Sequence, residues 1–190
     1  MTVQLYRHIQ QLVPAFAAEW EQLLLFLQTK TVKKDELLLR EGEICDTIYF
    51  VNTGCLYLFY ERSQEKQVIH FALENWWLTD YKTFCDGKPA VYANAAMEDS
   101  EITFMSRKSY EALQLQFPLL ALYFNKIHER AYGAALLKQK TFATVSKKDF
   151  YHYFKTTYPE LILRIPDAIF ASYMGVTIEA LKILQEGYVS

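Results

Sequence analysis

The segment Ile165–Val189 is predicted to form two short helices joined by a tight turn. Pro166 suits the first turn of the first helix, because its missing N–H is not needed there. Gly175 is expected to end that helix, since glycine adopts the left-handed conformation at little cost. Thr177 is a good N-cap for the second helix, Ile178–Glu186. Two such helices with a glycine-containing turn form the DNA-reading helix-turn-helix of many bacterial regulators.

The second of these helices offers few groups for contacts with DNA. The candidate DNA-binding residues are Thr177, Glu179, Lys182 and Gln185. Glu179 could accept a hydrogen bond from a cytosine amine, and Lys182 is the one cation of the set. Residues 146–190 carry 5 basic and 5 acidic residues, a net charge of zero. Because phosphate neutralisation supplies much of the affinity for DNA, this balance argues against tight binding.

Several short β-type runs are predicted between residues 31 and 105. They are 31–39, 47–51, 55–60, 67–73, 92–97 and 101–105. The loop Asn52–Gly54 predicts a hairpin between the second and third runs, and residues 98–100 predict another between the last two. Short strands at this spacing indicate a β-barrel or β-roll flanked by helices.

A long helix is predicted for residues 117–142, after a shorter one at 107–116. Its repeating apolar positions, spaced 4-3-4-3, are Leu120, Phe124, Ile127, Ala131 and Ala134. We interpret this stripe as a coiled-coil seam between two copies, since its alanines permit close approach of two backbones. The alternative is that the stripe packs on the roll, although Tyr123, Leu136 and Leu137 provide a second apolar face for that purpose. Apolar spacing also predicts a helix at 13–28, and a capping box at Ser146 predicts one at 147–156.

Composition excludes several classes of protein. No apolar run approaches the ~20 residues of a membrane span, and Met1–Arg7 does not resemble a signal peptide, so a cytoplasmic location is expected. Cys45, Cys55 and Cys85 are far apart and match no zinc or iron–sulfur spacing, so buried thiols are expected rather than a metal site. No catalytic grouping of side chains stands out, which indicates that the chain is not an enzyme.

The sequence contains two motifs, Leu39–Glu43 and Ile48–Gly54. In these motifs it resembles the Crp/Fnr family of bacterial transcription regulators. Residues 74–80 and 158–166 are similar to a variant common in Bacteroidetes. The resemblance implies an α+β fold with a cyclic-nucleotide-binding-like β-roll (a jelly roll) at 1–116, a long dimerisation helix at 117–145 and a short helix-turn-helix domain without a wing at 146–190. It also implies a homodimer that binds DNA, with a small-molecule effector.

The family's cAMP-binding members carry Phe-x-Gly-Glu and then Arg-Ser/Thr-Ala for the ribose hydroxyl and the cyclic phosphate. The matching pocket positions in this chain are Trp77, Thr79, Asp80, Ala90, Val91 and Tyr92, with Lys88 nearby. A side chain replaces the glycine, and the guanidinium that would pair with the phosphate is absent. Lys88 offers a point charge instead, which is not equivalent. We therefore expect no response to cAMP; the pocket is expected to take a less charged ligand or to be a filled aromatic core.

Cofactors of the family's other branches are not expected either. Iron–sulfur members use clustered N-terminal cysteines, whereas the first cysteine here is Cys45. Haem would need an axial ligand, and His70, His128 and His152 are isolated in the sequence.

The sequence also departs from the DNA-reading pattern of the family, which is Ser/Thr-Arg-Glu-x-x-x-Arg. Ile178 and Ile183 replace both arginines, each of which is worth roughly 1–3 kcal/mol of discrimination in a bidentate guanine contact. The leading hypothesis is a homodimeric regulator that does not respond to cAMP. The alternative is a degenerate sensor or protein-interaction module that no longer reads DNA, which exposed isoleucines would favour.

Overall fold

The computed structural model describes residues 3–16, 20–63 and 65–187. The chain divides into two compact units: unit 1 comprises Met1–Tyr60 and Ile69–His128, and unit 2 comprises Glu61–Val68 and Glu129–Ser190. Among the described residues, none of the helices is both long and apolar enough to cross a membrane. The same residues hold no cluster of three or more His, Cys, Asp or Glu side chains suited to a metal ion.

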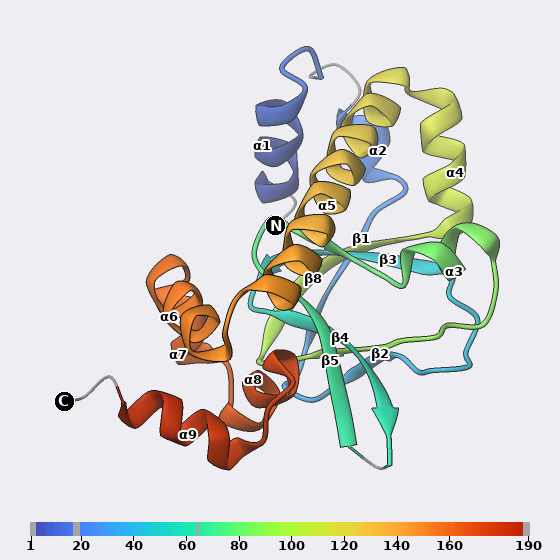
Figure 1. Cartoon of the computed structure of the whole chain (residues 1–190). Coiled ribbons are helices and arrows are strands. Elements are labelled where there is room, and N and C mark those ends of the chain that lie inside the picture. Colours follow the sequence, from blue (N-terminus) through green and yellow to red (C-terminus); the bar gives the residue numbers. More distant parts are fainter. Residues whose placement is uncertain (1–2, 17–19, 64, 188–190) are drawn as a thin grey trace. The chain divides into compact units, whose positions relative to one another are not determined.

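A β-roll of two four-stranded sheets forms the centre of unit 1 (Figure 1). The strands are β1 (Gln28–Val32), β2 (Leu37–Leu39), β3 (Thr47–Thr53), β4 (Leu56–Arg62), β5 (Glu65–Ala72), β6 (Trp77–Leu78), β7 (Ala93–Ala96) and β8 (Ser100–Ser106). One sheet has the order β1-β8-β3-β6 and the other β2-β7-β4-β5, so successive strands alternate between the sheets except for the neighbours β4 and β5. The mixed fold with a β-roll and long helices, predicted from the sequence, is confirmed.

Both hairpins predicted from the sequence are wrong. Strand β3 pairs with β6 and β8, and strand β4 pairs with β7. Strand β7 pairs with β2 and β4, whereas β8 pairs with β1 and β3. The turns β3–β4 and β7–β8 lie where the sequence predicts them, but each one connects a strand of one sheet to a strand of the other. The two faces then enclose an apolar core, which a flat hairpin ladder would leave half exposed.

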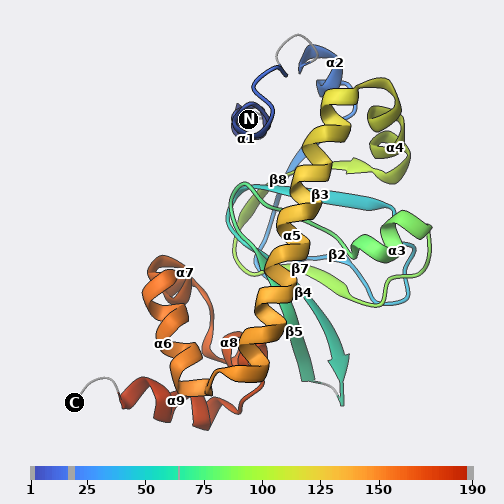
Figure 2. The same cartoon turned by 45° about the horizontal axis from the view of Figure 1, so that its top comes forward.

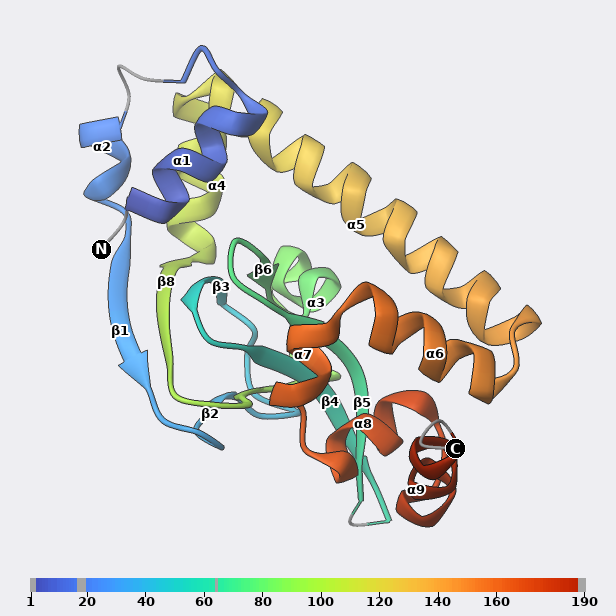
Figure 3. The ribbon, with the colours of Figure 1, turned by 90° about the vertical axis from the view of Figure 1, so that its left-hand side faces the viewer.

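Helices flank the roll in unit 1. They are α1 (Val3–Leu12), α2 (Trp20–Leu24), α3 (Tyr81–Asp86), α4 (Arg107–Gln116) and the first part of α5 (Pro118–Thr144). Figure 3 shows α1 and α4 beside the start of α5. Leu5 and Ile9 of α1 share a buried cluster with Leu113, Tyr123 and Phe124 of the other two helices. This cluster fixes the start of α5 on the roll.

The predicted helix at 13–28 is only partly correct. Helix α1 lies before it, and α2 covers just Trp20–Leu24, while residues 17–19 lie outside the described part of the chain. Val13 and Phe16 are buried. The apolar residues at 13–28 therefore correctly indicated buried positions, but not a continuous helix. The short helix or irregular segment expected at 76–84 is the strand β6 followed by α3.

Unit 2 is mainly a group of helices (Figure 2). Its helices are the remainder of α5, α6 (Lys147–Thr157), α7 (Pro159–Arg164), α8 (Asp167–Met174) and α9 (Ile178–Glu186). Aromatic rings of Phe150, Phe154, Phe170 and Tyr173 pack together between them. Ser146 caps α6 by accepting from the Asp149 N–H at 3.1 Å, as the capping box predicts. Gly175 adopts a left-handed φ of 66° after α8, and Thr177 accepts from the Ala180 N–H at 3.2 Å to begin α9.

The end of the β4–β5 hairpin also belongs to unit 2. Ser172 of α8 accepts from the Val68 N–H at 2.9 Å and donates its own proton to the Lys66 carbonyl. One hydroxyl therefore satisfies two backbone groups of β5, which attaches this strand segment to α8.

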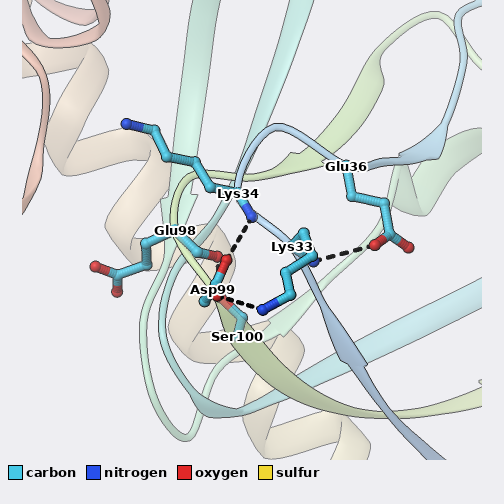
Figure 4. A network of polar contacts seen from close by, with 6 residues as sticks. All are labelled: Lys33, Lys34, Glu36, Glu98, Asp99 and Ser100. Carbon is cyan, nitrogen blue, oxygen red and sulfur yellow. Dashed lines mark hydrogen bonds and ion pairs between the residues drawn. The ribbon is translucent and has the colours of Figure 1, made fainter.

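A polar network joins the β1–β2 connection to the β7–β8 turn (Figure 4). Asp99 accepts from the Lys33 ammonium at 2.7 Å and from the Lys34 N–H at 2.9 Å. The Glu36 carboxylate accepts from the Lys33 N–H at 3.0 Å. The hydrogen bond with Lys33 lowers the pKa of Asp99, and Asp99 in turn raises the pKa of Lys33. Both side chains are largely exposed, so the network fixes the turn geometry more than it adds stability.

The turn between β3 and β4 depends on the absence of a side chain at Gly54. Gly54 has a φ of 95°, and a Cβ there would lie 2.1 Å from the Ser100 Oγ and 2.8 Å from the Ser100 Cα. Gly42 has a similar φ of 85°, but a Cβ there would meet nothing within 4 Å. A side chain at either position would strain the backbone, whereas only a side chain at Gly54 would also overlap with other atoms. Comparison of the two positions therefore distinguishes these two effects.

Replacement of Gly54 with alanine is expected to lower the free energy of unfolding by about 2–5 kcal/mol, since positive φ and overpacking both contribute. The matched variant Gly42→Ala should lose only about 1–2 kcal/mol, which is the conformational part. Urea denaturation of both variants measures the difference. Equal losses would show that Ser100 does not restrict this turn.

Candidate functional site

The Asp80 side chain is at the centre of the loop that the family's sequence pattern assigned to a nucleotide pocket. Asp80 is 3% exposed and precedes α3, where its carboxylate would be expected to cap the helix. Instead, it makes no side-chain capping bond and accepts from the backbone N–H groups of Val91 and Tyr92, at 2.8 and 3.2 Å. The Asp80 carboxylate therefore occupies two adjacent backbone N–H groups. Such a pair of donors would otherwise be able to bind an anion from solution.

Thr79 occupies the position where the family pattern has glycine. Its hydroxyl donates to the Thr47 carbonyl at 2.8 Å, which ties the loop to β3. The Cys45 thiol lies 3.2 Å from this hydroxyl and 3.6 Å from the Asp80 carbonyl. Burial is the main cause that raises the pKa of Cys45. The thiol thus fills space between the loop and β3 as a neutral group.

The other predicted pocket residues do not converge on one point. Lys88 is exposed and pairs with Asp86 at 3.6 Å. Ala90 is buried and donates its N–H to the Glu43 carbonyl at 2.7 Å, while the Val91 side chain is 53% exposed. Trp77 packs on Phe50 and donates its indole N–H to the Tyr123 hydroxyl at 2.9 Å. The structure brings together Thr79, Asp80 and the backbone of Val91 and Tyr92, and leaves Lys88 outside.

On α9, most of the candidate DNA contacts have intramolecular partners. Thr177 caps the helix, and the Gln185 amide donates to the Asp167 carboxylate at 3.0 Å. The backbone N–H of Glu179, and then the Thr177 hydroxyl, bind the Glu179 carboxylate and lower its pKa. Lys182 is exposed, and its charge contributes to the same lowering.

The predicted seam on α5 is divided between two environments. Leu120 and Phe124 are each 1% exposed and lie in the core of unit 1, and Ile127 packs against the same core. Ala131 and Ala134 are exposed. The expectation that Leu136 and Leu137 face the roll is wrong: they are 48% and 60% exposed, whereas Tyr123 is buried as predicted.

Two lysines of unit 2 lie against its aromatic core. The Lys138 ammonium is 4.1 Å from the centre of the Tyr173 ring and 5.4 Å from that of Phe142. The Lys147 ammonium donates to the Met174 carbonyl at the end of α8 and lies 5.0 Å from the Phe142 ring centre. Burial lowers the pKa of Lys138 to about 8 and raises that of Tyr173 to about 12.

Sequence reasoning missed several features of these units, among them helix α7 at Pro159–Arg164. Helix α1 was not predicted. Its buried residues Leu5, Ile9 and Leu12 are spaced i, i+4 and i+7, which is a helical pattern that could have indicated it. The role of Asp80 as a partner of the 91–92 backbone had no sequence signal, because the same residue type also fits a ribose contact.

Residues 29–116 match the sequence model of the cyclic nucleotide-binding domain family. A search of curated proteins gave no match to the sequence. Among solved structures, the Thermus thermophilus catabolite activator protein is similar with a TM-score of 0.58 and 18% identity, over 96% of this chain and 86% of that one.

Two further structures are more similar by TM-score. The c-di-GMP-responsive global regulator CLP of Xanthomonas campestris has a TM-score of 0.72 and 12% identity, over 89% of each chain. A mutant of CooA from Carboxydothermus hydrogenoformans has a TM-score of 0.71 and 14% identity, over 90% of this chain and 80% of that chain. At these identities the likeness concerns the fold, which is a cyclic-nucleotide-binding β-roll with long helices as in Crp/Fnr-type regulators.

Removal of the Asp80 carboxylate is expected to destabilise the loop. Asp80→Ala should lower the free energy of unfolding by about 2–4 kcal/mol, because two amide donors lose a charged acceptor. Asp80→Asn keeps one acceptor oxygen and should lose less. The exposed control Asp46→Ala should change stability by no more than about 0.5 kcal/mol. Urea denaturation at pH 7 measures all three; an alanine variant as stable as the control would contradict this role.

The buried ammonium of Lys138 makes stability depend on pH. Its pKa is about 8 in the folded chain and 10.5 in the reference state, so burial of the charge opposes folding at pH 7. Lys138→Met should therefore raise the free energy of unfolding at pH 7 by about 1–3 kcal/mol, after allowance for the lost contact with the Tyr173 ring.

The advantage of Lys138→Met should shrink between pH 8 and pH 10. In that window the folded wild type loses the proton while the unfolded chain retains it, so wild-type stability rises with pH. Lys140→Met, an exposed position on the same helix, is the control and should follow the wild type. Chemical denaturation at several pH values measures the difference, and a gap that stays constant with pH would refute this effect.

Proposed function

We propose that the chain is a Crp/Fnr-type transcription regulator that acts in the cytoplasm as a homodimer and does not respond to cAMP. Three segments divide its roles: a sensor at 1–116, a dimerisation helix at 117–145 and a DNA-binding segment at 146–190. The single observation that carries the proposal is the exposed apolar part of α5, because reading a two-fold operator requires a second copy of the chain.

This part of α5 comprises residues 131–137, with the sequence Ala-Tyr-Gly-Ala-Ala-Leu-Leu and no charged residue. Every residue in it is exposed, and Tyr132 is 69% exposed. A helix segment that is apolar on all sides is normally covered by protein. Ala131, Gly133 and Ala134 are small enough for the backbone of a second helix to approach closely. We therefore place the dimer contact here, with Leu136 and Leu137 joining Ala131 and Ala134 in the seam.

The absence of a cAMP response follows from Asp80. The Val91 and Tyr92 amides, at the position where the family pattern holds the cyclic phosphate, already donate to its carboxylate. An incoming phosphate would compete with this carboxylate for the same donors and would be repelled by its charge. Ala90 provides no guanidinium to offset that cost.

The proposed DNA contacts are Thr177, Glu179, Lys182 and Gln185 of α9. Lys182 is the one that supplies positive charge, and Gln185 would have to leave Asp167 to reach a base edge. We therefore expect modest affinity per copy, which the dimer raises by presenting two helices.

A second candidate function is a protein-interaction module that has lost DNA reading. The observation that favours it is the outer face of α9, where Ile178 is 39% and Ile183 is 69% exposed. Glu179 and Glu186 lie on the same exposed face, beside Lys182. An apolar face with net negative charge suits a protein partner better than a phosphate backbone.

The dimer is tested by Leu136→Glu, which places like charges opposite each other in the proposed seam. Light scattering after size exclusion should give twice the chain mass of 22.3 kDa for the wild type and a single mass for the variant. Leu115→Glu, at a position 88% exposed on α4, is the matched control and should remain dimeric. A monomeric wild type would refute the proposed dimer.

DNA reading is tested by selection from random duplexes, at low and near-physiological salt. A dimeric regulator should recover a palindrome with half-sites about one helical turn apart. Lys182→Ala should weaken binding to the selected sequence, whereas Lys108→Ala on α4 should not. Weak binding that ignores sequence and vanishes with salt would instead support the second candidate, because it reflects phosphate contacts alone.

A further inference from the structure

A polar cleft of about 500 Å³ lies in unit 1 between helix α1 and the sheet that contains β3 and β8. Helix α1 contributes Gln4, Arg7, His8 and Gln11, and the sheet side contributes Asn52 and Glu101. This volume falls within the range of small-molecule sites. The lining of this cleft includes none of the residues 77–80 and 88–92 that the sequence pattern assigned to a pocket.

The lining chemistry restricts what this cleft could hold. One cation, Arg7, and one carboxylate, Glu101, line it together with four side-chain amides and an imidazole. The ion pairs formed among the described residues involve neither Arg7 nor Glu101. A nucleotide would need several cations, and an apolar ligand would need an apolar lining, of which Val3 is the sole member. One charge of each sign instead matches a small zwitterion.

The carboxylate of Glu101 is held by a buried polar network. Asn52 is 2% exposed and donates to the Glu101 Oε1 at 3.2 Å and to the Thr103 hydroxyl at 2.9 Å. Thr103 also contacts the Thr29 hydroxyl at 3.2 Å. Polar groups inside a sheet cost free energy unless they are hydrogen-bonded, so this network is a built support that orients Glu101.

His8 connects the cleft to α5. The Tyr123 hydroxyl accepts from the Trp77 indole N–H at 2.9 Å and lies 2.8 Å from the His8 Nδ1. Because the indole can only donate, the Tyr123 oxygen accepts from Trp77, and its own proton can be donated to the His8 Nδ1 when that nitrogen is unprotonated. Tyr123 is fully buried in the core that fixes α5 on the roll. The Lys126 ammonium adds a second link by donating to the Leu12 carbonyl of α1 at 2.8 Å.

We propose that this cleft binds a free amino acid, with its carboxylate on Arg7 and its ammonium on Glu101. The amides of Gln4 and Gln11 line the remainder of the cleft and bind polar atoms of the ligand. His8 transmits occupancy through Tyr123 to Trp77 and α5. Binding of the amino acid requires neither DNA nor a second copy, so its outcome is independent of the proposed function.

The binding is tested by calorimetry with each of the common amino acids as the probe, on the full chain. At least one should bind with a dissociation constant in the millimolar range or below. Arg7→Met and Glu101→Gln should each weaken binding by about tenfold or more, since each removes a charge-assisted pair. Glu101→Gln retains an acceptor for Asn52, so the fold is preserved. The matched controls Arg62→Met and Glu65→Gln lie outside the cleft and should bind as the wild type does.

Three results would overturn the proposed site. They are the absence of heat with every amino acid, equal affinity in the charge variants, and binding of a dicarboxylate or a diamine in preference to the zwitterion. The last would assign the cleft a different ligand class.

The link to α5 is tested by the indole N–H resonance of Trp77, assigned with a Trp77→Phe variant. Saturation with the amino acid should shift this resonance in the wild type. Tyr123→Phe should abolish the shift, because the ring remains while the hydroxyl that joins His8 and Trp77 is lost. Tyr132→Phe, on the same helix but exposed, should retain it. A shift that persists in Tyr123→Phe, or is missing in the wild type, would refute the connection.

Discussion

The burial of Leu120, Tyr123 and Phe124 at the start of α5 is the constraint on which the packing of helices on the roll of unit 1 depends. These side chains are at most 1% exposed and share one cluster with α1 and α4. Because their contacts are apolar and close-packed, this part of the helix has one position on the roll. The same helix continues without interruption into unit 2, where its residues 131–137 are exposed. One helix is thus close-packed in its first part and exposed to solvent further along.

Local signals in the sequence predicted the helical half well, and pairing in the sheets poorly. Ser146, Gly175 and Thr177 set their helix ends through contacts within a few residues, so the chain near each position contains the whole cause. Strand partners are chosen by burial across the roll, which involves residues far apart in sequence. The turn at Gly54 has the composition of a hairpin, yet Gly54 lies close to Ser100 and β4 belongs to the other sheet. No local pattern distinguishes those outcomes.

The candidate sites show the same limit at the level of single side chains. Aspartate at position 80 is compatible with a ribose contact, with a helix cap and with the observed bonds to the 91–92 backbone. Only the relative positions of two loops decide between them. On α9 the residue types suggested DNA contacts, whereas Gln185 and Glu179 find partners within the chain. Ile178 and Ile183, by contrast, are exposed, as the alternative of a protein-interaction module requires, while Leu181 of the same helix is buried.

A ligand in the α1 cleft can act on α5 only by the difference in its affinity for two states of the chain. The path offered here is one hydrogen bond between His8 and Tyr123, and a neutral hydrogen bond contributes about 0.5–1.5 kcal/mol net. That amounts to about a two- to tenfold shift of a two-state equilibrium in one copy. If both copies of a dimer change together, the factors multiply to about a hundredfold at most. If the chain acts as the proposed regulator, a shift of this size would change its occupancy of DNA gradually rather than in an all-or-none way.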